Sequence, residues 1–332
     1  GFTPDMIWVK ARDIGYNHIL IDSLRRHSDA NSYYRLHTDT TNSQSDYNDN
    51  IYITNNGFNC YPRQSGVNEN NYNFVAWCWK AGGAPTADNS NTSGAMTANS
   101  VSLNGTLQSN YTPAGSPTIY PTRMSINTDA GFSIVKFAGT GNPATVPHGL
   151  SSAPDLRIIK GLDSNTDETQ NWFVWSAHSG SNAEGRLDLA NAFDLSATTM
   201  NGDSPVNSNT FPIGSNARNN QSAKNYIAYC WHSVAGYSKF GSYVGNGSAD
   251  GPYIECGFRV GWVLIKDATV SGGWLILDNQ RDEYNPSVNR IFANSSGVES
   301  TNALDSYDLL SNGFKVRNTN RNATGETIIY MA

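Results

Sequence analysis

Two Asp–Arg pairs occupy matching places in the sequence and are the first candidates for chemistry. Asp22 is followed three residues later by Arg25, and Asp278 is followed three residues later by Arg281. Each pair ends a short apolar run, and a third copy of that run ends in Ser176 instead. Carboxylate and guanidinium groups can hydrogen-bond to sugar hydroxyls, but the spacing also suits an ion pair that fixes a turn, worth less than about 1 kcal/mol when exposed. The four charged residues are therefore candidate glycan-binding residues, with a turn-fixing ion pair as the alternative.

Aromatic groups on the third copy of the run, residues 171–176, are the second candidates. Trp172 and Trp175 lie three residues apart, so on a strand they point to opposite faces. Trp172 shares its repeat position with Trp274, which favours the core for both. We therefore predict that Trp175 faces outward and that, together with the nearby His178, it contacts a glycan, because an indole face can stack on the C–H face of a sugar.

The remaining polar groups indicate turns more than ligand sites. Residues 163–168 are rich in Asp and resemble the start of a calcium loop, but the glycine needed at the sixth position is absent. His148 lies at a module turn, and the Asn-Gly and Asp-Gly steps in residues 246–252 are explained by tight turns alone. We predict no metal site and no cofactor.

Enzyme signatures are missing from the sequence. There is no GxSxG elbow, HExxH zinc motif, GxGxxG nucleotide loop or P-loop. A retaining glycosidase needs two carboxyl groups about 5–5.5 Å apart, and no strand carries closely spaced acidic residues. The prediction is a protein without catalytic activity, and a polysaccharide depolymerase is the least favoured alternative.

Composition excludes further classes. The chain has 332 residues, 15% of them charged, and a net charge of −6, whereas a nucleic-acid binder usually has a basic face. No apolar run approaches the ~20 residues of a membrane-spanning helix. The four cysteines are too few for a disulfide scaffold in a chain of this length. With 8 Trp, 17 Tyr and 12 Phe, the chain has enough aromatic residues to build a core.

The elements that position these groups recur along the chain. Each block has a first strand ending in Lys, a second strand carrying the candidate residues, and a closing aromatic strand. The first strands lie in residues 1–10, 149–160 and 257–266, the second strands in 17–22, 171–176 and 273–278, and the closing strands in 72–79, 226–231 and 327–332. These repeats predict module one (residues 1–83), module two (131–235) and module three (236–332).

A leading strand is found in only two of the modules. Residues 131–137 match residues 236–243, and module one has no counterpart. We therefore expect an exposed edge at Met6–Lys10, or one that is paired by a strand from upstream or from another subunit.

Residues 84–130 separate the first two modules. They are rich in Ser, Thr, Asn and Pro and poor in apolar residues. The segment is either a disordered tether or an extended arm that packs on a neighbouring module.

The fold class follows from the local pattern. Short runs of alternating polarity, rich in aromatic and β-branched residues and bounded by Gly and Asn, predict strands throughout. Strands of this length and spacing predict an all-β protein built of tandem β-sandwich, jelly-roll-like modules.

Three strings in modules two and three carry a family resemblance: GYSKFGSYVGNGSADGP at 236–252, LSNGFK at 310–315 and IYMA at 329–332. They resemble a repeat domain found in structural proteins of marine tailed bacteriophages, cyanophages among them. The resemblance implies lectin-like β-sandwich modules in a tail fibre or another virion appendage. It defines no catalytic residues.

The resemblance also implies a place and partners for the chain. We expect an extracellular location in the virion, other virion subunits as partners, a homo-oligomer such as a trimer, and contact with host-surface glycans. Nucleic-acid binding and membrane insertion are not expected. The alternative function is purely structural, as a capsid-decoration or tail-associated subunit.

Overall fold

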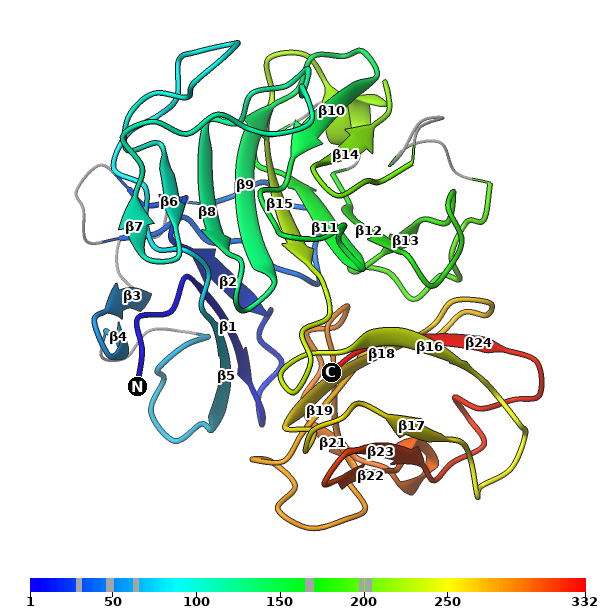
Figure 1. Ribbon diagram of the computed structural model, residues 1–332. Coiled ribbons are helices and arrows are strands. Elements are labelled where there is room, and N and C mark those ends of the chain that lie inside the picture. Colours follow the sequence, from blue (N-terminus) through cyan, green and yellow to red (C-terminus); the bar gives the residue numbers. More distant parts are fainter. Residues whose placement is uncertain (28–31, 46–50, 62–65, 165–169, 197–199, 201–204) are drawn as a thin grey trace.

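The computed structural model describes residues 1–27, 32–45, 51–61, 66–164, 170–196, 200 and 205–332 (Figure 1). In these residues the chain forms 24 strands, one four-residue helix, α1 (Ala217–Asn220), and one 3-10 turn, η1 (Ala303–Asp305). The all-β prediction is confirmed. None of the helices in the described part of the chain has the length and apolarity needed to cross a membrane.

Module one is a three-stranded sheet covered on one face by a hairpin. The sheet has the order β2 (Ile19–Asp22), β1 (Met6–Ala11), β5 (Phe74–Trp79), and the hairpin consists of β3 (Ile51–Thr54) and β4 (Gly57–Cys60). Every residue of β1 and β2 is buried, because both faces of this sheet are covered.

Module two has the largest sheet. Its eight strands have the order β13 (Gly185–Arg186), β12 (Trp172–Ser176), β11 (Leu156–Gly161), β15 (Asn225–Trp231), β9 (Phe132–Ala138), β8 (Arg123–Asn127), β6 (Val101–Leu103) and β7 (Thr106–Leu107). A second layer is formed by β10 (Ala144–Pro147) paired with β14 (Thr210–Ile213).

Module three repeats the plan. Its main sheet has the order β16 (Phe240–Val244), β24 (Thr327–Met331), β18 (Trp262–Asp267), β19 (Leu275–Asp278), β20 (Asn289–Phe292) and β21 (Ser300–Thr301). Its second layer contains β17 (Tyr253–Glu255), β23 (Gly313–Val316) and β22 (Tyr307–Leu310).

The strand order corrects the predicted open edge. In modules two and three, the closing strand (β15, β24) lies between the leading strand (β9, β16) and the first strand (β11, β18). The leading strand therefore never touches the first strand. Residues 6–9 are paired on both sides, by β2 and β5, and Lys10 is paired with β5, so the prediction of an exposed or trans-paired edge at Met6–Lys10 is wrong. In the part of the chain that the structure describes, β5 has a partner strand on one side, β1, and none on the other.

Residues 84–130 contribute β6, β7 and β8 to the sheet of module two. Five of their apolar side chains are buried in the core of that module: Met96, Val101, Ile119, Met124 and Ile126. The segment is thus an arm packed on its neighbour, although its composition also allowed a tether.

The three main sheets turn one face toward a common centre. The shared core takes Leu20 from module one, Val174 from module two and Ile276 from module three, with their neighbours on each sheet. The opposite face of each sheet packs on that module's own second layer. The modules therefore pack into one body with a common core, and are not separate domains joined by linkers (Figure 1).

Equivalent hydrogen bonds join module one to two, two to three and three to one, so the contacts between modules form a ring. At one repeat position a ring nitrogen meets a backbone carbonyl of the next module: Trp172 Nε1 to His37 O (2.9 Å), Trp274 Nε1 to Arg186 O (2.8 Å) and His18 Nε2 to Phe292 O (3.0 Å). At another, two backbones meet: Gln44 N to Leu162 O (3.0 Å), Phe193 N to Ala268 O (2.9 Å) and Glu299 N to Arg12 O (2.6 Å). The arrangement is a closed pseudo-three-fold ring within one chain.

Candidate functional site

The predicted Asp22–Arg25 pair lies inside the molecule. Arg25 Nε donates to Asp22 Oδ2 at 2.7 Å, and the side chains are 1% and 0% exposed. The same carboxylate oxygen accepts a 2.6 Å hydrogen bond from the hydroxyl of Tyr229, which belongs to module two. Burial, followed by the Asp22 charge, raises the pKa of Tyr229 well above its ordinary value, so this hydroxyl keeps its proton.

The Asp278–Arg281 pair has the same geometry. Arg281 Nε donates to Asp278 Oδ2 at 2.7 Å, and the carboxylate also accepts from Trp77 Nε1 of module one at 3.1 Å. A second carboxylate, Glu299, binds the Arg281 guanidinium at 2.9 Å. These pairs fix turns and tie neighbouring modules together, as the ion-pair alternative expects. Both are buried, so neither presents a polar surface to a glycan.

At the interface between modules two and three, Ser176 stands where the other two interfaces have an aspartate. Tyr229 and Trp77 occupy equivalent positions, because each pairs with the third residue of its first strand. The equivalent residue of module three is Met331, which pairs with Leu264. Methionine has no N–H or O–H to donate. The interface between modules two and three therefore lacks both groups: Met331 stands in place of the donor and Ser176 in place of the carboxylate.

The prediction that Trp175 faces outward is wrong. Its side chain is 6% exposed, because the second layer of module two covers this face of the sheet. Trp175 Nε1 donates to Ser181 O at 3.1 Å, and the buried Arg157 guanidinium lies 5.6 Å from the ring centre. His178 is exposed, with Nε2 3.8 Å from Asp155 Oδ1. The structure therefore does not join Trp175 and His178 into one surface.

The other polar candidates serve turns. His148 is buried, accepts a hydrogen bond from the Leu150 amide at 3.1 Å and contacts Asn207 O at 3.1 Å, and burial lowers its pKa to about 4. Residues 165–168 of the calcium-like segment lie outside the described part of the chain, while Asp163 accepts a hydrogen bond from the Asn225 amide at 2.7 Å. Among the described residues, no three His, Cys, Asp or Glu side chains gather as metal ligands would.

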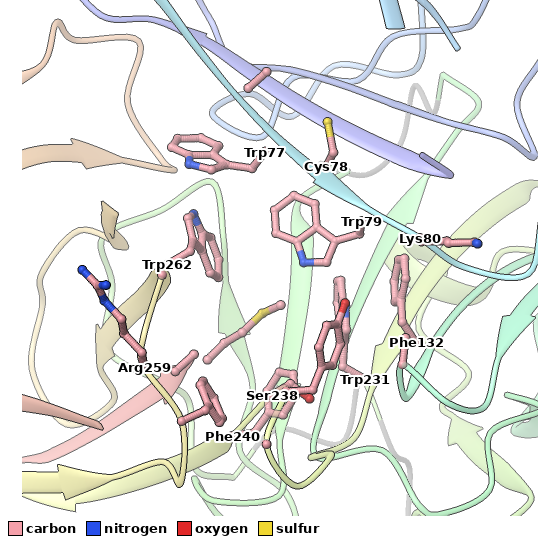
Figure 2. Close-up of a pocket in the computed structure, with 18 residues that line it drawn as sticks. Trp77, Cys78, Trp79, Lys80, Phe132, Trp231, Ser238, Phe240, Arg259 and Trp262 are labelled. Carbon is pink, nitrogen blue, oxygen red and sulfur yellow. The ribbon is translucent and has the colours of Figure 1, made fainter. Parts of the chain in front are cut away.

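A cavity of about 470 Å³ lies where the three modules meet, beside the free edge of β5 (Figure 2). All three modules contribute to its wall, and eight of the 18 lining residues are aromatic. The labelled lining residues are Trp77, Cys78, Trp79, Lys80, Phe132, Trp231, Ser238, Phe240, Arg259 and Trp262. Sequence patterns place Trp77 and Trp79 on a closing strand but carry no signal that this strand borders a cavity.

The rings in the cavity wall contact one another. Trp79 meets Trp262 edge to face, with ring centres 5.4 Å apart, and Phe132 stacks on Trp231 at 4.8 Å with 10° between the planes. In Figure 2, Trp79 points into the space while Cys78 points to the other side of β5. The indole nitrogens of Trp231 and Trp262 are buried and have no hydrogen-bond partner among the described residues. Such buried donors are costly to leave unpaired.

The comparisons with known proteins give a family and no function. Neither the curated proteins nor the solved structures include a match to the chain. One family model, described as a domain of unknown function (DUF7483), matches residues 1–117 and again residues 108–332. The two matches together span the whole described ring and its arm, so the chain belongs to the DUF7483 family.

Proposed function

We propose that this chain is a non-enzymatic structural subunit of a phage virion appendage, such as a tail fibre. The observation that carries the proposal is that the buried Asp–Arg pairs connect the modules to one another. The Asp–Arg pairs hold the contacts between modules, where a ligand-binding protein would direct such groups to solvent.

Buried lysines have the same use. Lys160 Nζ donates to Thr41 O of module one at 3.0 Å, and Lys266 Nζ donates to Ala190 O of module two at 3.1 Å. Both lysines are the penultimate residue of a first strand, at the same repeat position. A rigid, closed body of this kind suits a load-bearing particle component.

The virion location rests on the resemblance of residues 236–252, 310–315 and 329–332 to the phage repeat domain. Its partners would be other virion subunits. The test is mass spectrometry of density-purified phage particles that encode the chain, with immunogold labelling of intact particles. We expect peptides from the chain in the particle fraction and gold on the tail or capsid surface. Peptides found only in the host-cell fraction would contradict the proposal.

A second candidate function, contact with a host-surface glycan, is favoured by the aromatic cavity. Trp79 and Trp262 offer indole surfaces, and Lys80 and Arg259 lie at the exposed margin. The test is a glycan array with the labelled chain, with reducing-sugar release measured in the same wells. Saturable binding lost in Trp79→Ala but kept in Tyr284→Ala, which alters an 83% exposed aromatic outside the cavity, would support this function. Sugar release would instead support a depolymerase.

A further inference from the structure

The free edge of β5 is the place where module one departs from its two copies. In module two, the closing strand β15 pairs with β11 on one side and with β9 on the other. In module three, β24 pairs in the same way with β18 and β16. In module one, β1 is the one strand that β5 pairs with among the described residues. The repeat therefore predicts both the position and the direction of an absent strand.

The backbone of β5 is oriented to receive that strand. Asp5 N donates to Trp79 O and Arg12 N donates to Asn73 O, both at 2.8 Å. Because hydrogen-bonding groups alternate along a strand, the odd-numbered residues face β1 and the groups of Ala76 and Cys78 face the free edge. Module two shows the same alternation, with Asp155 N bonded to Trp231 O on one side and His232 N bonded to Gly131 O on the other.

β5 is more exposed than its counterpart β15, as expected for a strand that lacks one neighbour. Six of the seven residues of β15 are buried, whereas in β5 only Trp77 is buried and Ala76 is exposed. The aromatic cavity lies along residues 76–80, on the side where the absent strand belongs.

The pairing in module two also predicts the side chains of the missing strand. Phe132 lies opposite Trp231 and stacks on it, and Ile134 lies opposite Tyr229. Trp79 and Trp77 are the equivalents of Trp231 and Tyr229. An aromatic residue opposite Trp79 and an aliphatic residue opposite Trp77 would both point toward the shared core.

Space continues past the end of β5. A second hollow of about 440 Å³ is lined by Phe2, Lys80, Asn127, Asp129, Ala130 and Tyr237, and shares Lys80, Ala130 and Tyr237 with the cavity. A segment running antiparallel to β5 would enter here, beside Lys80, and continue toward Phe74.

We propose that the free edge of β5 accepts an extended segment from outside residues 1–332 that carries the leading-strand pattern of this repeat. The segment completes the sheet of module one by main-chain hydrogen bonds and places an aromatic side chain against Trp79 in the cavity. This is strand addition at a sheet edge, in which the backbone gives affinity and alternate side chains give specificity. The inference goes beyond the proposed function, because it concerns how the sheet of module one is completed, whatever the location of the protein.

The experiment uses the full chain and a fluorescein-labelled synthetic peptide that copies residues 131–138. Fluorescence anisotropy measures binding, and hydrogen exchange measures protection of the β5 amides. We expect saturable binding and slower exchange in residues 74–80. A peptide with Phe132→Asp should bind at least ~10-fold more weakly, because it would place a charge against the Trp79 ring.

Two variants of the chain separate strand addition from other uses of the cavity. Ala76→Pro removes an N–H at the free edge and leaves the β1 side intact, a place where edge strands tolerate proline. It should abolish peptide binding, and Ala76→Thr, which keeps the N–H, should bind as the parent does. Circular dichroism and thermal melting of both variants confirm that each is folded.

Three results would overturn the proposal. One is the absence of peptide binding at millimolar concentration, and another is binding that Ala76→Pro leaves unchanged. The third is a glycan that binds in a manner sensitive to Trp79→Ala but not to Ala76→Pro, which would assign the cavity to sugar recognition. Because the virion location is tested on particles and strand addition on the purified chain, failure of one is distinguishable from failure of the other.

Discussion

The carboxylates of Asp22 and Asp278 are each shared between two modules. Each accepts from its own arginine and from a ring donor of the neighbouring module. Truncating one member of such a buried pair leaves an uncompensated charge, which costs about 3–5 kcal/mol. The donor from the neighbouring module can be removed alone, without unpairing the charges.

Tyr229→Phe makes that smaller change. It deletes the hydroxyl that donates to Asp22 and keeps the ring in the core. Because a hydrogen bond to a charged group contributes about 1.5–3 kcal/mol, we expect the free energy of unfolding to fall by this amount in urea denaturation followed by circular dichroism. Tyr237→Phe, at an exposed tyrosine, should change it by less than about 0.5 kcal/mol. Equal effects of the two variants would refute the role of the shared carboxylate.

Buried lysines predict an increase in stability with pH. Burial lowers the pKa of Lys160 from 10.5 to about 7. Between these values the unfolded chain binds more protons than the folded chain, so the free energy of unfolding rises as the pH rises. The increase in the free energy of unfolding begins near the folded-state pKa of about 7 and is complete above the unfolded-state pKa of 10.5.

Lys160→Met isolates this effect. Between about pH 6.5 and about pH 8.5, the stability of the parent relative to the variant should rise by roughly 1–2 kcal/mol. Denaturant titrations at each pH measure the difference, and Lys239→Met, at an exposed lysine, is the control. Parallel pH profiles for the parent and Lys160→Met would contradict this prediction, because they would show that the pKa of Lys160 does not change on folding.

At this scale the sequence predicted the turn-fixing geometry of the Asp–Arg pairs as one of two alternatives. It misplaced Trp175, because alternation along a strand says which residues share a face and not whether a second layer covers that face. Aromatic residues with β-branched neighbours suit both a buried and an exposed face.

At the scale of the elements, local sequence patterns do not predict which strands are neighbours in each sheet. The repeats identified the first, second, leading and closing strands from residue type and spacing. Which strand lies beside which is set by pairing between distant residues. The repeats alone therefore predict an open edge at Met6–Lys10, whereas the strand order puts β5 at the edge of the sheet.

The arm in residues 84–130 gives an element-scale prediction. Ile126 lies on β8 and is fully buried in the core of module two, and Leu107 lies on β7 in the same arm and is 40% exposed. Ile126→Ala should lower the free energy of unfolding by about 2–5 kcal/mol, whereas Leu107→Ala should cost less than about 1 kcal/mol. Urea denaturation measures both. A negligible effect of Ile126→Ala would mean that the arm behaves as a tether in solution.

For the whole molecule, the ring makes the three modules interdependent. The shared core draws side chains from all of them, and none can bury its inner face alone. We therefore expect differential scanning calorimetry to show one unfolding transition for the chain.

Trp274→Ala tests that coupling. The ring of Trp274 lies in the shared core and its nitrogen bonds to Arg186 O of module two. The variant should lower the melting temperature of the single transition, since removal of a buried Trp costs about 3–5 kcal/mol. A transition that splits, with only the module-three part shifted, would contradict the ring as a cooperative unit.

The position of β24 has a consequence for the order in which the chain acquires its structure during synthesis. A ribosome delivers residues 327–331 after the strands β1 to β23, yet β24 lies between β16 and β18. Until those residues emerge, the two strands that flank them have no partner between them, and the third side of the ring stays open. Modules one and two can pair their strands while translation continues, but closure of the ring waits for β24 to leave the exit tunnel.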